Sequence, residues 1–190
     1  MRHLRKGRKL GRNPNHQRAL LKNLIIAILM TEREDADLDD NTPKVPGRII
    51  TTLEKAKEVR PLLEKCVTIA KKAQKYIEDA KEFESKFDRD KLSGKKLREN
   101  ENWQKWNKTI APALAARRRA LQIIGDKKAV KILFEIVAPR FVDRNGGYTR
   151  ILKLFKPRLG DAGKRAILEF VGQNARVKQQ RAVRPKVEAE

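Results

Sequence analysis

Residues 48–73, RIITTLEKAKEVRPLLEKCVTIAKKA, place a short β-branched run directly before a long amphipathic segment. The run Arg48 to Thr51 is a strand candidate, since β-branched side chains favour extended backbone. After it, Pro61 lacks a backbone donor, and we expect it to kink or restart a helix near Arg60. Apolar residues recur here at the spacing of one buried helix face; they are Leu53, Ala56, Val59, Leu63, Cys66, Val67 and Ala70.

Two further strand candidates flank a basic loop towards the C-terminus. They are Tyr148 to Phe155 (YTRILKLF) and Arg165 to Val171 (RAILEFV), with the loop at Lys156 to Lys164. Two such runs joined by a loop that contains glycine predict an antiparallel hairpin. Together with the 48–51 run, they predict a small mixed three-stranded sheet packed on helices, which is an α+β fold.

Helical patterns fill most of the remaining chain. A first helix is expected to begin near Asn15, a good N-cap residue, and to end near Thr31. Residues 74–112 carry alternating charges and helix formers around a Ser93-Gly94 break, so they predict two helices or a helical hairpin. Residues 113–124 are typical of a helix. A last helix should start at a cap on Asp126, close at Pro139 and bury Val130, Leu133, Phe134 and Val137.

The predicted organisation is a basic arm at 1–14, a single α+β domain at 15–172 and a basic tail at 173–190. The arm, MRHLRKGRKLGRNP, buries too little to fold alone and is expected to become ordered on its partner. Inside the domain, residues 31–46 are predicted to form an acidic loop and 74–112 a helical insertion. The acidic run is interpreted as a solvated loop rather than a cation site.

The charge of the chain indicates the class of partner. Its 190 residues include 46 Lys and Arg against 24 Asp and Glu, a net charge of +22. This excess favours a polyanionic partner and disfavours an ordinary cytosolic enzyme. The first 30 residues hold eight cations and no acid, and residues 113–172 hold fourteen cations and five acids. Aromatic residues are 5% of the chain, too few for a large platform that stacks single-stranded nucleic acid.

The cysteine content and the hydropathy bear on the compartment. A single cysteine, Cys66, permits no internal disulfide and no cysteine-based zinc site, which fits a reducing environment. The longest apolar run, Leu24 to Met30, is far shorter than the roughly 18 residues that cross a bilayer. We therefore expect a cytoplasmic protein that begins at Met1 and has no membrane partner.

Residues for catalysis are scarce. The chain has two serines, both within 74–112, and two histidines, His3 and His16, in its basic N-terminal stretch, where no rigid Ser-His-Asp site can be held. We expect the histidines to contact phosphate or a base rather than a metal. We expect no enzyme activity, no cofactor and no small-molecule substrate. Trp103 and Trp106 share a helix face and either pack in the core or anchor a neighbouring molecule.

Basic residues gather in two further places besides the arm. Three consecutive arginines, Arg117 to Arg119, sweep about 200° around a helix, so at least one or two should reach an anion or cross the helix end. A second group surrounds the Gly146-Gly147 turn, where glycine permits close approach of a ligand; its members are Arg140, Arg144, Arg150, Lys153, Lys156 and Arg158. A rigid basic surface beside a flexible arm suits structured RNA.

Three blocks of the sequence resemble, in order, the bacterial large-subunit ribosomal protein seventeen family. They are MRHLRKGRKLGRNPNHQRALLKNL at the start, IITTLEKAKEVRPLLEKCVTIAKKA at 49–73 and APRFVDRNGGYTRILKLFKPRLGDAGKRAILEFV at 138–171. The chain departs from the family pattern by insertions at 31–46 and 74–112 and by an extension after residue 173.

The resemblance implies a non-enzymatic structural constituent of the large ribosomal subunit. Such a protein would bind the main rRNA near the rim of the peptide exit tunnel and contact neighbouring large-subunit proteins in the cytoplasm. From charge and resemblance together, the residues expected to contact rRNA are Arg2, His3, Arg5, Lys6, Arg8, Lys9, Arg12, Asn13, His16, Arg18, Lys22, Arg117, Arg118, Arg119, Arg140, Arg144, Gly146, Gly147, Tyr148, Thr149, Arg150 and Lys153.

Two other functions compete with this interpretation. An architectural protein that coats DNA would use the same charge and would bind random duplexes as well as rRNA. An RNA-modifying enzyme would need a cofactor loop or a catalytic cluster, and the sequence contains neither pattern.

Overall fold

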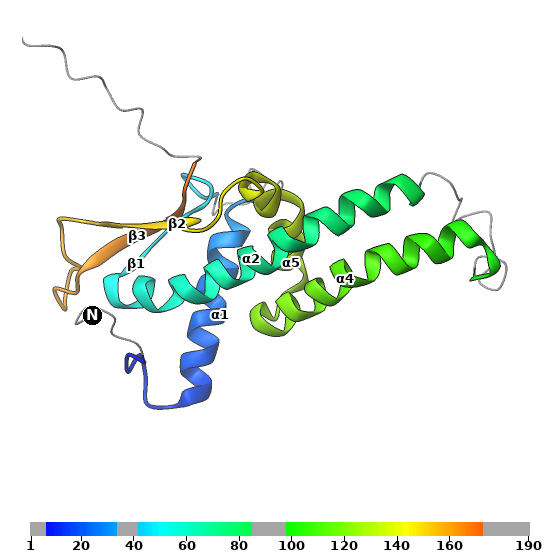
Figure 1. The fold of residues 1–190 in the computed structure, drawn as a ribbon. Helices are drawn as coiled ribbons and strands as arrows, with labels where there is room; N and C mark the ends of the chain where they lie inside the picture. The colour runs from blue at the N-terminus through cyan, green and yellow to red at the C-terminus, as the bar shows by residue number, and fades with distance from the viewer. Residues whose placement is uncertain (1–6, 34–41, 85–97, 173–190) are drawn as a thin grey trace, which may run out of the picture.

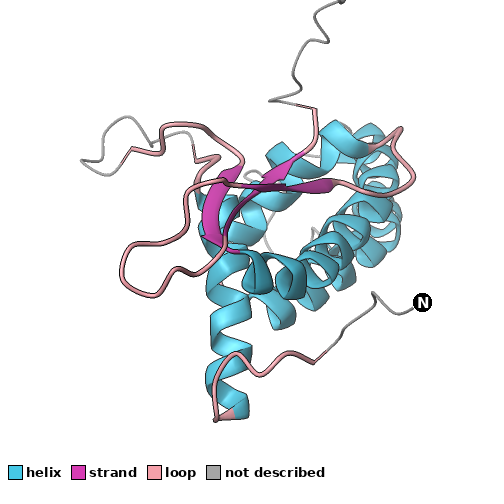
Figure 2. Cartoon of the chain, turned by 90° about the vertical axis from the view of Figure 1, so that its left-hand side faces the viewer, coloured by secondary structure: helices cyan, strands magenta, loops and turns pink. Residues whose placement is uncertain are grey.

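The computed structural model describes residues 7–33, 42–84 and 98–172 (Figure 1). Helices form one layer and a small sheet packs against one side of them, as Figure 2 also shows. This arrangement confirms the predicted α+β class. The elements in chain order are α1 (Pro14–Met30), β1 (Arg48–Thr52), α2 (Leu53–Glu84), α4 (Glu101–Ile124), α5 (Lys127–Ile132), the π-helical turn η2 (Leu133–Val137), the 3-10 turn η3 (Ala138–Phe141), β2 (Thr149–Lys153) and β3 (Arg165–Phe170).

The sheet has the order β1-β3-β2 and is antiparallel throughout. The prediction of a mixed sheet is therefore wrong in its strand directions. The predicted hairpin forces β3 to run opposite to β2, and β1 pairs with the other edge of β3 rather than with β2. Leu168 of β3 pairs in register with Ile49 and Ile151, and it is fully buried against the helices.

Helix α2 follows β1 without a loop and buries the apolar face predicted for it. All seven residues of that face have an exposed fraction of 8% or less. The helix also runs through Pro61, so the expected restart near Arg60 does not occur. Proline removes the hydrogen bond to the carbonyl of Lys57. Both residues lie on the exposed side of the helix, where water can satisfy that carbonyl.

Helix α1 begins at Pro14, one residue before the predicted start near Asn15. Asn13, rather than Asn15, is the N-cap, because its side-chain oxygen accepts the Asn15 N–H at 2.8 Å and Pro14 takes the first helical position. The helix ends at Met30 with Thr31 as C-cap, as predicted. The Thr31 hydroxyl accepts the Gly47 N–H at 2.9 Å. This bond joins the two ends of the acidic segment, of which residues 34–41 lie outside the described residues.

The two helices expected within 74–112 are the distal part of α2 and the first part of α4. These helices lie side by side (Figure 1). Small buried residues, such as Ala73 on α2 and Ala113 on α4, let the two backbones approach closely. The Ser93-Gly94 break lies outside the described residues. Trp103 and Trp106 are half-buried on α4, so the structure favours neither core packing nor a fully exposed anchor for a neighbouring molecule.

The segment after α4 bends around the core by changing its helix type. Gly125 ends α4 with a φ of 88°, a left-handed conformation that favours glycine. Asp126 then caps α5 by accepting the Lys128 N–H, and the four predicted core residues are buried. Pro139 does not close a single helix as expected. It lies inside a helical run that passes from α5 through η2 into η3 and ends at Phe141.

A buried carboxylate joins the three strands. Glu169 on β3 is fully buried, although it lies on the sheet face that points away from the helices. It accepts a hydrogen bond from the Arg48 Nε at 2.7 Å and a second one from the Arg150 Nε. Since Arg48 is on β1 and Arg150 on β2, this ion cluster ties both edge strands to the central strand.

We predict that Glu169→Gln lowers the free energy of unfolding by about 2 kcal/mol, because hydrogen bonds to a charged group contribute about 1.5–3 kcal/mol. The exposed Asp143→Asn variant removes the same charge and should change stability by less than about 0.5 kcal/mol. Urea unfolding with unchanged m-values measures both. Equal stability of the two variants would contradict the role given to Glu169.

Candidate nucleic-acid interface

The described residues offer little basis for chemistry other than anion binding. In those parts of the chain, no three His, Cys, Asp or Glu side chains converge as metal ligands would. Cys66 is fully buried, and burial raises the pKa of its thiol to about 11. None of the described helices combines the length and the hydropathy that a membrane crossing requires. The surface features that remain are clusters of Lys and Arg.

The N-terminal arm is anchored on α2 where the structure describes it. Arg8 Nη1 contacts Glu58 at 2.9 Å, and the Gly7 N–H donates to the same carboxylate at 3.0 Å. Lys9 and Arg12 remain exposed beside this anchor. Four predicted contacts lie outside the described residues, namely Arg2, His3, Arg5 and Lys6.

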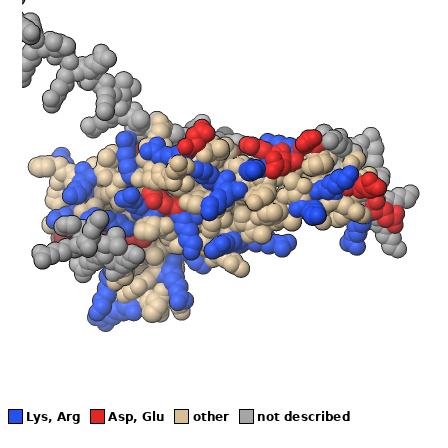
Figure 3. Space-filling view, in the orientation of Figure 1, with Lys and Arg blue, Asp and Glu red and all other residues tan. Residues whose placement is uncertain are grey.

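The N-terminal turns of α1 project beyond the other helices (Figures 1 and 2). His16 and Arg18 are exposed on this projection, and Lys22 is half-buried nearer the body. Asn13 is exposed too, but its side-chain oxygen is occupied by the helix cap. Figure 3 shows Lys and Arg covering this lower end of the molecule. The projection therefore presents cations on an ordered helix rather than on a loose chain.

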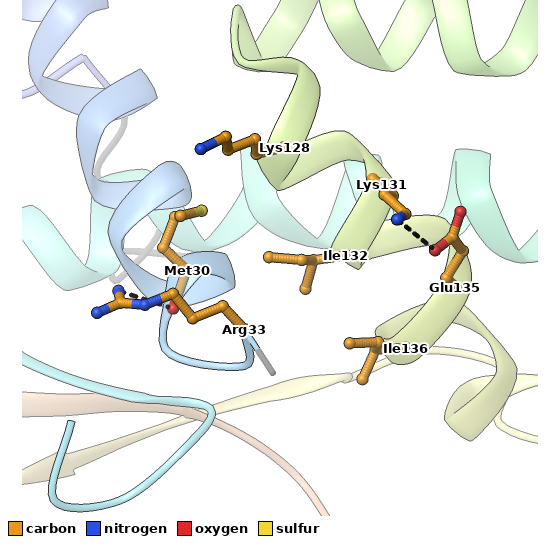
Figure 4. Close-up of a pocket in the computed structure, with 7 residues that line it drawn as sticks. All are labelled: Met30, Arg33, Lys128, Lys131, Ile132, Glu135 and Ile136. Carbon is orange, nitrogen blue, oxygen red and sulfur yellow. Dashed lines mark hydrogen bonds and ion pairs between the residues drawn. The ribbon is translucent and has the colours of Figure 1, made fainter. Parts of the chain in front are cut away.

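A second basic region surrounds α5, and we call it the α5 surface. Two hollows flank this helix. The hollow of about 330 Å³ between α1 and α5 is shown in Figure 4, and the other, of about 220 Å³, lies between α4 and α5. The cations of the α5 surface are Lys22, Arg33, Arg117, Arg118, Lys127, Lys128 and Lys131, which line a hollow or, in the case of Lys22, lie beside the α4–α5 turn.

The α5 surface keeps several of its cations available for an external anion. Glu135 contacts Lys131 Nζ at 3.8 Å and Arg117 at 3.6 Å, and Arg117 also lies over the Phe134 ring. Arg118 and its neighbours Lys127 and Lys128 are exposed and form no ion pair within the described residues. Arg119 is exposed as well, on the α2 side of α4. The expectation that one of the three arginines reaches an anion is met by Arg117.

Sequence reasoning missed the lysines of α5. The signal was present, because Lys127 and Lys131 are four residues apart after the Asp126 cap and so share one helix face. What the sequence did not reveal is that α5 packs between α1 and α4, which brings these lysines next to Arg118 and Arg33.

Two of the residues predicted to contact rRNA at the Gly146-Gly147 turn are buried, so their side chains point into the core. Arg144 is exposed, and its carbonyl accepts a hydrogen bond from Lys71 Nζ at 2.7 Å. Gly147 has a φ of 61°, which favours glycine. Tyr148, however, is buried with its ring 5.2 Å from that of Phe141, and the buried Thr149 hydroxyl donates to a carboxylate on α2. These two side chains serve the core in this structure.

Two predicted contact arginines form internal ion pairs. Arg150 contacts the buried Glu169, as described above. Arg140 donates two hydrogen bonds to Glu32, at 3.0 and 2.9 Å, and Glu32 is only 8% exposed. This pair ties the end of α1 to η3. By contrast, Lys153 at the end of β2 is exposed and forms no ion pair among the described residues.

Six of the fifteen acidic side chains among the described residues lie away from these cations. They concentrate at the distal ends of α2 and α4, which form the right-hand end of the molecule in Figure 3. The members described there are Glu78, Asp79, Glu82, Glu84, Glu99 and Glu101. The charge is therefore polarised along the long axis, and a polyanion would meet the end that carries α1, α5 and the sheet.

Comparison with known proteins gives a consistent result. A family model described as Ribosomal protein L17 matches residues 20–171. The Large ribosomal subunit protein bL17 of Rhodopirellula baltica is 60% identical over 177 residues, which cover 93% of this chain and 84% of that protein. The bL17 proteins of Syntrophotalea carbinolica and Halothermothrix orenii are 31% and 34% identical, over 100% and 86% of this chain and 87% and 96% of their own lengths.

We predict that Arg140 and Arg118 respond differently to replacement by alanine. Arg140→Ala leaves the carboxylate of Glu32 buried without its two hydrogen bonds and should lower the free energy of unfolding by about 2 kcal/mol. Arg118→Ala removes an exposed cation and should change it by less than about 0.5 kcal/mol. Urea unfolding measures both variants. Arg140 has no structural role if the two variants are equally stable.

Proposed function

The chain belongs to the ribosomal protein L17 family, and from this premise we propose that it binds the rRNA of the large ribosomal subunit as a structural constituent. Relatives that match most of the chain carry the name of a large-subunit protein. The proposal places the protein in the cytoplasm, near the rim of the peptide exit tunnel and next to other large-subunit proteins, and gives it no catalytic step.

The observation that carries the proposal is the polarised display, on helices, of cations that form no ion pair with any other described residue. Arg118 and Lys127 line the hollow between α4 and α5, Lys128 lines the hollow between α1 and α5, and Arg18 is exposed on the projecting end of α1. Cations held in fixed positions suit a folded RNA, which proteins recognise mainly through its backbone shape and 2′-hydroxyls. Binding would gain free energy from the counterions that these cations displace from phosphates.

The proposed contact set follows the predictions with the changes that the structure requires. The arm, the start of α1, the α5 surface and the backbone of the Gly146 turn meet phosphates, with Arg144 beside that turn and Lys153 at the far end of β2. Arg140 and Arg150 hold the fold instead, and Tyr148 and Thr149 pack inside it. The lysines of α5 join the set.

We predict that the variant Arg118→Gln, Lys127→Gln, Lys128→Gln binds large-subunit rRNA with a weaker dependence on salt. Each lost phosphate contact reduces the slope of log affinity against log salt by about 0.7 to 0.9, so the slope should fall by about 2. Filter binding across a salt series measures it.

The matched control removes three exposed lysines from the distal helices, Lys75→Gln, Lys105→Gln and Lys108→Gln. Its net charge equals that of the α5 variant, and its slope should stay within error of the wild type. Equal slopes for the two variants would show that net charge, and not the α5 surface, governs binding. Equal affinity of the wild type for random DNA duplex would favour the architectural alternative.

We also predict that removing residues 1–10 abolishes stable incorporation into large subunits while the core stays folded. The truncation keeps Asn13 and therefore the cap of α1. It removes the Arg8–Glu58 pair and the Gly7 N–H bond to the same carboxylate, and it takes no residue from the buried apolar core. Sedimentation of subunits and circular dichroism provide the two readouts. Retention of the truncated chain in washed subunits argues against a binding role for the arm.

A further inference from the structure

The loop between β2 and β3, residues 154–164, carries two apolar side chains that none of the described residues covers. Phe155 and Leu159 are each 100% exposed. Figures 1 and 2 show this loop projecting past the edge of the sheet, away from the helices. Leaving both side chains in water forgoes the free energy that burial of apolar surface provides. Large exposed apolar side chains at a projecting tip therefore point to a partner.

The shape of this loop does not depend on Phe155 or Leu159. The Arg158 guanidinium hydrogen-bonds the Asp161 carboxylate, with Nε to Oδ1 at 2.8 Å, and Asp161 also accepts the Gly163 N–H at 3.1 Å. The Arg158 N–H donates to the Gly163 carbonyl at 2.9 Å. The hydrogen bond from Arg158 also holds the pKa of Asp161 well below its usual range. The loop is thus organised internally and presents its apolar side chains outward.

The surroundings of the two side chains are cationic. Between Lys153 and Arg165 the chain carries five cations and one acid, and that acid, Asp161, is already bonded to Arg158. Lys153, Lys156 and Lys164 are exposed and form no ion pair within the described residues. A partner that covers this tip must offer apolar surface and negative charge within a few ångströms of each other. Nucleic acid has both, because its flat bases lie between phosphates.

We propose that the 154–164 loop is an RNA contact in which the Phe155 ring stacks on an unpaired base, Leu159 packs beside it, and Lys156 and Lys164 bind the flanking phosphates. This inference rests on the proposed rRNA binding and adds a stacking interaction to it. RNA loops and bulges expose unstacked bases, and proteins commonly cover such bases with aromatic side chains. One exposed ring suffices for one base, so the low aromatic content of the chain is compatible with this contact.

Four variants of the full chain test the stacking, with protein-free large-subunit rRNA as the probe. Phe155→Ala and Phe155→Leu should each bind about tenfold more weakly, since both lose the ring. Phe155→Trp should bind like the wild type. None of these three should change the salt slope, because no phosphate contact is lost, whereas Lys156→Gln should reduce it by about 1.

The matched control is Leu114→Ala, which trims an exposed apolar side chain on α4 and should leave the affinity unchanged. Because Phe155 is fully exposed, its variants should also unfold at the wild-type temperature. If the wild type binds rRNA and Phe155→Ala binds equally well, the stacking proposal is wrong while the proposed function stands. If the wild type itself does not bind rRNA, both are wrong.

A crosslinking experiment identifies the partner in assembled subunits. A chain with Phe155→p-benzoylphenylalanine is incorporated and irradiated, and the adduct is mapped. An adduct with rRNA supports the proposal. An adduct with a ribosomal protein shows that the tip fills an apolar pocket on a neighbouring protein instead, and that result overturns the proposal, as does the absence of any adduct.

Discussion

Burial of the apolar face of α2 is the constraint on which the rest of the structure depends. All three strands, α1, α4 and the turns η2 and η3 pack against this helix. The face contains small residues, such as Ala56 and Ala70, between larger ones, so several elements approach it closely on different sides. Since the core is built around one helix, the outer surfaces of α1, α4 and α5 stay free to carry charge.

Arginine has two roles in this protein, and burial of the partner separates them. Where an acid is buried, as with Glu32 and Glu169, arginines surround it and join elements that are distant in sequence. Arg140 binds Glu32 through two nitrogens, and two arginines bridge Glu169. A lysine has a single ammonium group and could not form the two-nitrogen contact with Glu32. Where no acid is near, as at Arg118, the guanidinium faces solvent. The cations that the fold does not use are therefore the ones most available to the proposed interface.

These features together describe a rigid body with projecting basic parts. The anchored arm, the free end of α1 and the β2–β3 loop all extend from the end of the molecule opposite the acidic tip of α2 and α4. In the proposed complex the RNA partner is itself folded, so fixed cations lose little conformational entropy on binding. Electrostatic attraction and shape would then act together, while the proposed stacking of Phe155 would add a contact that is insensitive to salt.

The sequence by itself determined the local structure of this protein and the class of its partner. Periodicity identified the buried faces of α2 and of the segment after Asp126, and the excess of cations indicated a polyanion, because both depend only on neighbouring residues or on composition. Tertiary structure alone decided the strand order, the continuity of α2 through Pro61 and the inward orientation of Tyr148. It also decided which arginines are available, since Arg140 and Glu32 are 108 residues apart and their pairing depends on how α1 and η3 pack. Such long-range contacts leave no local pattern, and for this reason the sequence could suggest a basic interface but not its members.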